Sequence, residues 1–253
     1  MYPFTFALFI VLVLSPASVP ASTQNQHIQG KQPGKTVILV HGYYEDSRDM
    51  QTLAHFLEKQ GYRPVTVDLP LTFKHIPKAA KVFAKRVEAI LSGLPDKEPV
   101  AMVGHSAGGL VIRYFLSHNP NNKRVTHAVL VATPNRGVAL AGMLGEISNS
   151  LVETLATLDS LQPENISNLQ LSDPPGTRMG AIAGNKSTII LGQLLEKEND
   201  GRVEVESVYY PGLDDFVVLP HSHKEIHRRK ETAELVERFL NSASFALQTD
   251  PGT

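Results

Sequence analysis

The chain has 253 residues, of which 42% are hydrophobic and 19% charged, and this composition is typical of a globular protein with one large domain. Its 24 basic and 25 acidic side chains nearly cancel, so no overall positive field favours a nucleic-acid partner. The absence of cysteine excludes disulfides, a cysteine nucleophile and thiolate metal sites.

The N-terminal segment has the pattern of a secretory signal peptide. Residues 4–14 are apolar except for Thr5, and the small residues in 15–21 offer cleavage sites. A permanent membrane anchor is the weaker alternative, because the run is shorter than the roughly 20 apolar residues that a spanning helix needs. The first Lys or Arg is Lys31, so the usual positive start is missing. We predict an exported protein whose residues 1–21 are removed.

The rest of the chain predicts a linker at 22–34, one α/β domain at 35–245 and a short tail at 246–253. The strands are expected at these apolar runs: Thr36–His41, Pro64–Leu69, Pro99–Gly104, Val125–Ala132 and Phe216–Leu219. The helices are expected at these amphipathic or apolar segments: Arg48–Gln60, Pro77–Leu91, Ala107–Ser117, Val138–Leu161 and Lys230–Leu240. Residues 188–195 are not assigned a type. Alternating strands and helices favour a mostly parallel sheet with helices on both faces.

The segment Gly104-His105-Ser106-Ala107-Gly108 follows a buried strand and begins a helix. A nucleophile elbow needs this context, because the serine must lie on a tight turn that exposes its Oγ above the sheet. Small residues two before and two after the serine allow the strand and the helix to approach each other. The alternative is an incidental glycine-rich turn. We predict that Ser106 is a nucleophile.

A second segment, His41-Gly42-Tyr43, ends the first expected strand. Acyl transfer needs two backbone N–H donors for the oxyanion of the tetrahedral intermediate, each contributing about 3 kcal/mol to lowering the barrier. One donor in this geometry is the residue after the nucleophile, Ala107. Tyr43 is our candidate for the other, against the alternative that His41 and Gly42 form an ordinary turn.

Three motifs together resemble bacterial lipases and related esterases of the α/β-hydrolase superfamily. They are, in chain order, Val40-His41-Gly42-Tyr43, the segment from Gly104 to Tyr114, and Ala132-Thr133-Pro134-Asn135-Arg136-Gly137. The resemblance extends from about residue 36 to residue 240. It implies an α/β-hydrolase fold, hydrolysis of carboxylic esters, the order serine, acid, histidine along the chain, and a helical lid after the strand that precedes Thr133.

The general base must be a histidine on a loop after the last strand. Leu219-Pro220-His221-Ser222-His223 lies there and offers two candidates. The family resemblance favours His223, which follows a serine and precedes a short helical segment, and leaves His221 beside the cleft.

The acid that orients the base is predicted at Asp200. Residues 200–207 resemble the Asp-Gly-x-Val-Pro segment of the lipases, and Asp200 stands 23 residues before His223. Asp214 and Asp215 are nearer in sequence, but they directly precede a strand that carries the histidine at its far end. They are therefore expected at the opposite edge of the sheet.

The resemblance places the lid at 138–175, where an apolar helix face would favour long acyl chains and transient contact with lipid interfaces, against the alternative of a plain packing helix. We predict an ester or lipid substrate and no cofactor. A metal site is disfavoured, although His221, His223 and His227 have ligand-like spacing. An acyltransferase, thioesterase or amidase would use the same residues, and a non-catalytic binding protein is the remaining alternative. The sequence leaves the oligomeric state open.

Overall fold

The computed structural model describes residues 35–72, 74–138, 160–187 and 197–247. Contacts divide the chain into Met1–Gln32 and Pro33–Thr253, and all described residues belong to the second unit. The predicted signal peptide, the predicted linker, residues 188–195 and most of the predicted tail lie outside the described residues. So do residues 139–159 of the predicted lid.

The centre of this unit is a six-stranded sheet in the order β2-β1-β3-β4-β5-β6, and every described strand pair is parallel. The strands are β1 (Thr36–Val40), β2 (Arg63–Val67), β3 (Val100–His105), β4 (Val125–Val131), β5 (Arg178–Gly184) and β6 (Asp215–Leu219). The longer helices are α1 (Gln51–Lys59), α2 (Ile76–Ser92), α3 (Ala107–His118) and α9 (Lys230–Ser242). The short ones are η1 (Ser47–Met50), α5 (Pro163–Asn168), α7 (Val205–Val208) and α8 (His223–Ile226).

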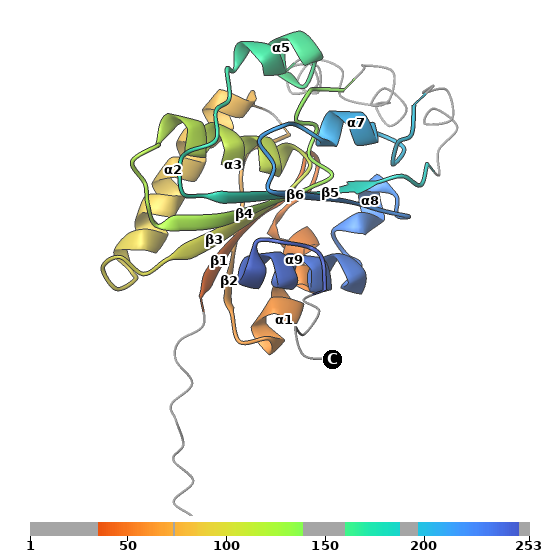
Figure 1. Cartoon of the computed structure of the whole chain (residues 1–253). Coiled ribbons are helices and arrows are strands. Elements are labelled where there is room, and N and C mark those ends of the chain that lie inside the picture. Colours follow the sequence, from red (N-terminus) through yellow and green to blue (C-terminus); the bar gives the residue numbers. More distant parts are fainter. Residues whose placement is uncertain (1–34, 73, 139–159, 188–196, 248–253) are drawn as a thin grey trace, which may run out of the picture. The chain divides into compact units, whose positions relative to one another are not determined.

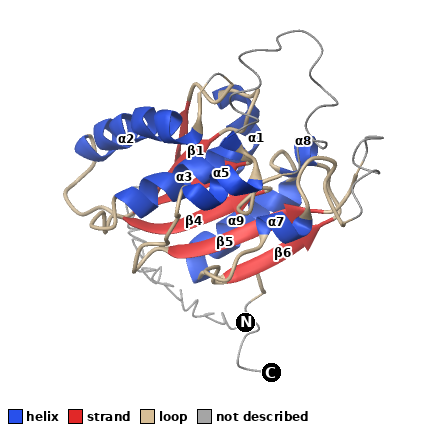
Figure 2. Cartoon of the chain, turned by 90° about the horizontal axis from the view of Figure 1, so that it is seen from above, coloured by secondary structure: helices blue, strands red, loops and turns tan. Residues whose placement is uncertain are grey.

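Helices cover both faces of the sheet, with α2 and α3 on one face and α1 and α9 on the other (Figures 1 and 2). Strand β1 shows why the sequence requires two layers. Ile38 and Val40 pack in the core beneath α2 and α3, whereas Val37 and Leu39 pack in the core beneath α1 and α9. Because successive strand residues point to opposite faces, an uninterrupted apolar run forms a strand that is buried on both sides.

The predicted parallel sheet and the helices on both of its faces are confirmed. The structure differs from the prediction in two details. The helix predicted from Arg48 begins as the 3-10 turn η1, where Asp46 accepts a hydrogen bond from the Arg48 backbone N–H, and α1 follows. Strand β5 was missed entirely. Its sequence is rich in glycine and alanine, which are depleted in strands, and Gly180 is needed because a Cβ there would lie 2.6 Å from the ring of Phe239.

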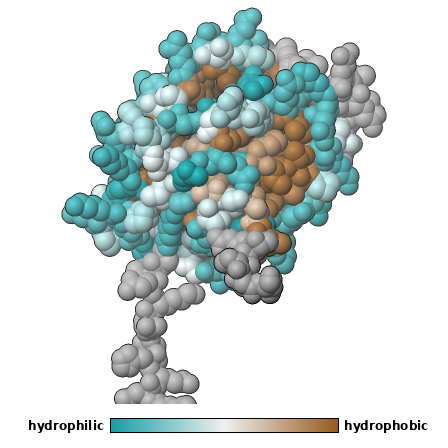
Figure 3. Space-filling view, viewed as in Figure 1, coloured by the Kyte–Doolittle hydropathy of each residue, from teal (hydrophilic) through white to brown (hydrophobic). Residues whose placement is uncertain are grey.

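The visible surface is mainly hydrophilic, and hydrophobic residues gather in the upper half of the view in Figure 3. Among the described residues, the exposed large hydrophobic side chains are Tyr44, Tyr209 and Leu247. The described part of the chain has no helix that combines the length and the apolar character needed to cross a membrane.

Candidate active site

Ser106 lies at the turn between the end of β3 and the start of α3, with φ 50° and ψ −124°. A non-glycine residue with positive φ stores about 1–3 kcal/mol of backbone strain, which the surrounding structure must hold. Two backbone hydrogen bonds do so here: the Ser106 N–H donates to the Val131 oxygen at 2.8 Å, and the Gly109 N–H donates to the Ser106 oxygen at 3.0 Å. The strand-to-helix turn predicted for the elbow is therefore present.

The glycines around Ser106 are required by close contacts of the backbone. A Cβ on Gly104 would lie 2.5 Å from the Gly109 nitrogen, and a Cβ on Gly108 would lie 2.3 Å from the His41 carbonyl oxygen. A Cβ on Gly42 would lie 3.1 Å from the Ser106 Cβ. These contacts bring the end of β1 directly against the elbow, so the segment predicted to hold an oxyanion adjoins the predicted nucleophile.

A buried chain of hydrogen bonds joins the three residues that the sequence singled out. His223 Nε2 lies 3.0 Å from Ser106 Oγ, and His223 Nδ1 lies 2.7 Å from Asp200 Oδ2. A carboxylate only accepts, so it fixes the neutral imidazole as the Nδ1–H tautomer. The unprotonated Nε2 then faces the serine hydroxyl and can accept its proton.

Hydrogen bonds from the backbone of its own loop fix the Asp200 carboxylate. Its Oδ1 accepts hydrogen bonds from the backbone N–H groups of Arg202 and Val203, at 3.0 and 2.8 Å. Its backbone oxygen accepts from the His223 N–H at 2.9 Å. Asp200 and His223 are 1% and 4% exposed, so water does not compete for their contact.

The environment of His223 lowers its pKa below the usual value of histidine. Burial is the main cause, and it outweighs the opposing effect of the Asp200 charge and hydrogen bond. Nearby charge on His105 and Arg202 lowers the pKa further. The ring is consequently neutral near pH 7, which a general base requires.

The rival candidates lie elsewhere. His221 Nε2 is 2.9 Å from Glu231 Oε2 and is not part of the chain to Ser106. Asp214 accepts from the Met179 N–H at the start of β5, and Asp215 accepts from Ser244 and Phe245 at the start of β6. Both carboxylates are therefore at the amino-terminal edge of the sheet, as expected from their positions in the sequence.

The loop after β1 is fixed by His41, which is 1% exposed. The Leu69 N–H donates to His41 Nε2 at 3.0 Å, so Nδ1 carries the proton of the neutral ring and donates to the Gly42 oxygen at 2.8 Å. Tyr43 follows on this loop, and Ala107 is the first residue of α3. Both predicted oxyanion donors thus belong to segments that contact the elbow.

The sequence-based predictions did not include a cluster beside the site that is formed by the partly buried Glu45 and the buried His105 and His227. Glu45 Oε2 lies 2.8 Å from His105 Nδ1 and accepts from the Gly42 N–H at 2.7 Å, and the His105 and His227 ring centres are 3.8 Å apart. The signal that could have indicated it is the acidic residue three positions after Gly42, because a glutamate side chain can reach back over three residues to a backbone N–H.

Only part of the predicted lid can be compared with the structure. The Val138 N–H donates to the Leu161 oxygen at 2.9 Å, so the two residues that flank this stretch of chain meet. After Leu161, α5 lies above α3, and Ile166 contributes to the core on that side (Figure 1). The lid itself stays a prediction.

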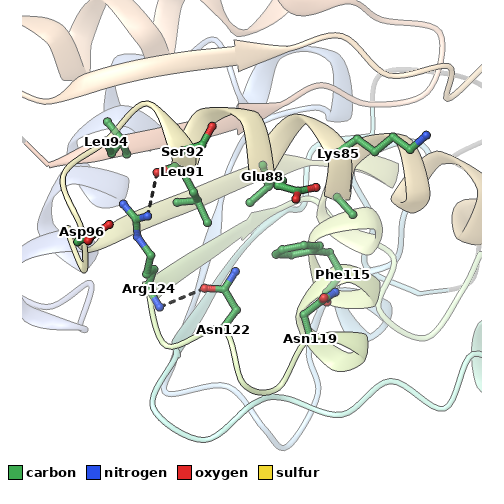
Figure 4. A pocket seen from close by; sticks show the side chains of 12 residues that line it. Lys85, Glu88, Leu91, Ser92, Leu94, Asp96, Phe115, Asn119, Asn122 and Arg124 are labelled. Atoms are coloured by element: carbon green, nitrogen blue, oxygen red, sulfur yellow. Dashed lines mark hydrogen bonds between the residues drawn. The ribbon is translucent and has the colours of Figure 1, made fainter.

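A cavity of about 530 Å³ lies away from this site, between α2 and the C-terminal half of α3 (Figure 4). Arg124 lines it, but its guanidinium donates to the backbone oxygens of Leu91, Pro95 and Glu98. These bonds stabilise the loop between α2 and β3. Ser106 does not line this cavity. We assign Arg124 a structural role.

The protein-family model for the alpha/beta hydrolase fold matches residues 35–187, which is more than half of the chain. The chain belongs to the α/β-hydrolase fold family. The matched segment begins at β1 and includes the elbow and the loop after β4, which are the places where the three sequence motifs lie.

Two plant proteins and several solved structures resemble this α/β hydrolase. It is 32% identical over 102 residues to "Putative methylesterase 14, chloroplastic" of Arabidopsis thaliana, a match that covers 38% of this chain and 29% of the plant protein. The lipase BlEst2 of Bacillus licheniformis in its mature form has a TM-score of 0.67 at 21% identity, over 83% of this chain and 92% of the lipase. The metagenomic carboxyl esterase MGS0156 has a TM-score of 0.61 at 19% identity, over 76% and 65% of the two chains. At these identities the structural likeness establishes the fold.

Proposed function

We propose that the protein hydrolyses carboxylic esters, with Ser106 as nucleophile, His223 as general base and Asp200 as the residue that orients it. One observation carries the proposal: a strained turn holds a serine whose hydroxyl is hydrogen-bonded to a buried histidine, and that histidine is itself bonded to a buried carboxylate. Structural cores seldom combine backbone strain with a lowered histidine pKa, whereas active sites commonly do.

The proposed reaction assigns one role to each of these groups. His223 Nε2 takes the proton of Ser106 as Oγ attacks the ester carbonyl, and the N–H groups of Tyr43 and Ala107 bind the oxyanion. Asp200 stabilises the imidazolium, which then protonates the departing alcohol. Water repeats the two steps on the acyl-enzyme, so that the acid leaves and Ser106 regains its proton. No cofactor enters this scheme.

An ester substrate is supported by the names of the relatives, which include plant methylesterases and bacterial lipases. A thioester, an amide or a second acyl acceptor would use the same groups, and no contact among the described residues favours one of them. We propose further that residues 138–175 cover the site as a lid and that residues 1–21 direct export.

The test is the hydrolysis of p-nitrophenyl esters with acyl chains of two to sixteen carbons. Ser106→Ala should abolish turnover and labelling by a fluorophosphonate, because both require the hydroxyl. Ser92→Ala, at an exposed position on α2, is the control and should retain wild-type rates. Near-normal activity in folded Ser106→Ala would disprove the assignment.

The chain-length profile of the same series tests the lid. A maximum at eight carbons or more would support a covering segment with an apolar face, since a long acyl chain gains from apolar contacts. A maximum at two to four carbons would contradict it and indicate an open site for small soluble esters.

A further inference from the structure

His105 connects three separate segments of the site. Its Nδ1 lies 2.8 Å from Glu45 Oε2 on the loop after β1, and its Nε2 lies 3.1 Å from the backbone oxygen of His223. Its own backbone forms the end of β3, directly before Ser106. The segments that carry the nucleophile, the base and the predicted oxyanion donor are therefore linked through one imidazole.

The two partners of this ring define its charge. A carboxylate and a carbonyl oxygen can only accept hydrogen bonds, so His105 satisfies both contacts only when each ring nitrogen carries a proton. His41, by comparison, has one accepting and one donating nitrogen and is neutral. His105 is 1% exposed, and a buried cation needs a counterion, which Glu45 supplies.

Glu45 has matching properties. Burial raises the pKa of its carboxyl group, but the charge and hydrogen bond of His105, followed by His227 and the Gly42 N–H, hold that pKa well below its usual range. The carboxylate binds the Gly42 N–H at 2.7 Å, one residue before Tyr43. Its position therefore determines where the chain enters the predicted oxyanion loop.

We propose that Glu45 and doubly protonated His105 form a partly buried ion pair that positions the oxyanion loop and the His223 loop relative to Ser106. They are positioning residues, since neither contacts the reacting atoms, and their role rests on the ester hydrolysis proposed above. Their effect is on the transition state, because the distances from the oxyanion donors and the base to the reacting carbon matter most when charge develops there.

The neighbouring ring of His227 completes the group of side chains around the ion pair, and this group must be weighed as a metal site. Burial, followed by the charge of His105, lowers the pKa of His227 to about 2, so this ring is neutral. The Glu45, His105 and His227 donor atoms are close enough for a metal ion, and the two rings lie 3.8 Å apart with a tilt of 30° between their planes. Both ring nitrogens of His105 are engaged by Glu45 and by the His223 backbone oxygen, so neither is free to bind an ion while these contacts hold.

Kinetics of Glu45→Gln and His105→Asn test the positioning role. Gln keeps the size of the side chain and an oxygen for the Gly42 N–H, but loses the charge. We expect kcat to fall about 10- to 100-fold in either variant with KM changed less than about threefold, as for a displacement of about 1 Å at the reacting centre. The double variant should lose no more than the single ones, because the pair acts as a unit.

The matched controls are Glu58→Gln and His55→Asn, the same substitutions at exposed positions of α1, which should leave kcat unchanged. The pH profile adds a readout that a merely structural role would not move. The charged and titratable groups facing His223 are Asp200, Arg202, His105 and His227. Loss of the His105 charge should move the acid limb of the kcat/KM profile to higher pH.

Nitrogen-15 NMR of histidine side chains tests the pair without any need for activity. With His105 assigned from the spectrum of His105→Asn, two protonated ring nitrogens at pH 7 are expected in the wild type. A singly protonated ring would overturn the proposal even if Ser106-dependent turnover is normal. Absence of turnover together with a doubly protonated ring would instead refute the ester chemistry and leave the ion pair intact.

Two further outcomes overturn the proposal. One is additive loss of kcat in the double variant, which would mean that the two residues act separately. The other is one equivalent of bound metal in the purified wild type that is lost in Glu45→Gln, which would make the cluster a metal site.

Discussion

The substitution Asp200→Asn separates the proposed orienting role of the carboxylate from its place in the fold. Asparagine has almost the same shape as aspartate. Its side-chain oxygen can still accept from the backbone N–H groups of Arg202 and Val203, whose nitrogens lie 3.0 and 2.8 Å from Asp200 Oδ1 in the native protein. Its amide nitrogen replaces Oδ2, which lies 2.7 Å from His223 Nδ1. Because an amide nitrogen donates, the imidazole must place its proton on Nε2 and can no longer take the proton of Ser106.

We expect the loss of kcat to be about 10,000-fold, as when a carboxylate that sets the tautomer of a general base becomes an amide. That factor corresponds to about 5 kcal/mol of activation free energy, at about 1.4 kcal/mol for each factor of ten. The assay is kcat/KM for p-nitrophenyl butyrate, with circular dichroism to verify folding.

The control is Asp215→Asn, which removes a carboxylate at the amino-terminal end of β6 that binds Ser244 and Phe245. It should lower stability without lowering kcat by more than about twofold, since the described contacts of Asp215 are with Phe216, Ser244 and Phe245 and not with the elbow. A folded Asp200→Asn enzyme that loses less than tenfold in kcat would refute the reasoning, as would an equal loss in Asp215→Asn.

Three more predictions concern pH, packing and processing. The acid limb of kcat/KM should have its midpoint below pH 6.5, because a lowered pKa keeps His223 neutral at more acidic pH; a midpoint above 7 would contradict this. Gly108→Ala should lower the free energy of unfolding, measured by chemical denaturation, by about 3 kcal/mol or more, since the new Cβ would lie 2.3 Å from the His41 oxygen. The control Gly93→Ala, whose new Cβ would have its nearest atom at 3.5 Å, should change that free energy by less than about 1 kcal/mol. Intact mass should show that residues 1–21 are absent from the exported protein, and a full-length exported chain would contradict the predicted signal.

The fold could be predicted from the sequence where the signal is both local and chemically specific. The run from Thr36 to Val40 predicts a two-sided strand because every residue is apolar or β-branched. The glycines around Ser106 predict a close strand-to-helix turn because larger residues would overlap the backbone. In both cases the residues that carry the signal are the residues that make the contact.

Other features could not be predicted because their cause lies far away in the chain. Strand β5 contains small residues since Gly180 faces the ring of Phe239, and no local pattern contains that requirement. The contact of Glu45 with His105 spans 60 residues and appears only when β1 and β3 become neighbours. An ion pair between a loop and the end of a distant strand has no periodicity, so the sequence does not show that Glu45 and His105 are partners.

Three histidines at the carboxyl-terminal edge of the sheet show why motif spacing alone could not assign roles there. His41 receives one hydrogen bond and gives one, His105 faces two acceptors, and His223 faces a carboxylate on one side and a hydroxyl on the other. The first ring is therefore neutral and structural, the second is the proposed cation, and the third is the proposed base, a neutral ring whose accepting nitrogen faces the Ser106 hydroxyl. Because the hydroxyl can donate or accept, only His223 can change its protonation without breaking a contact, and this is the property that a general base must have.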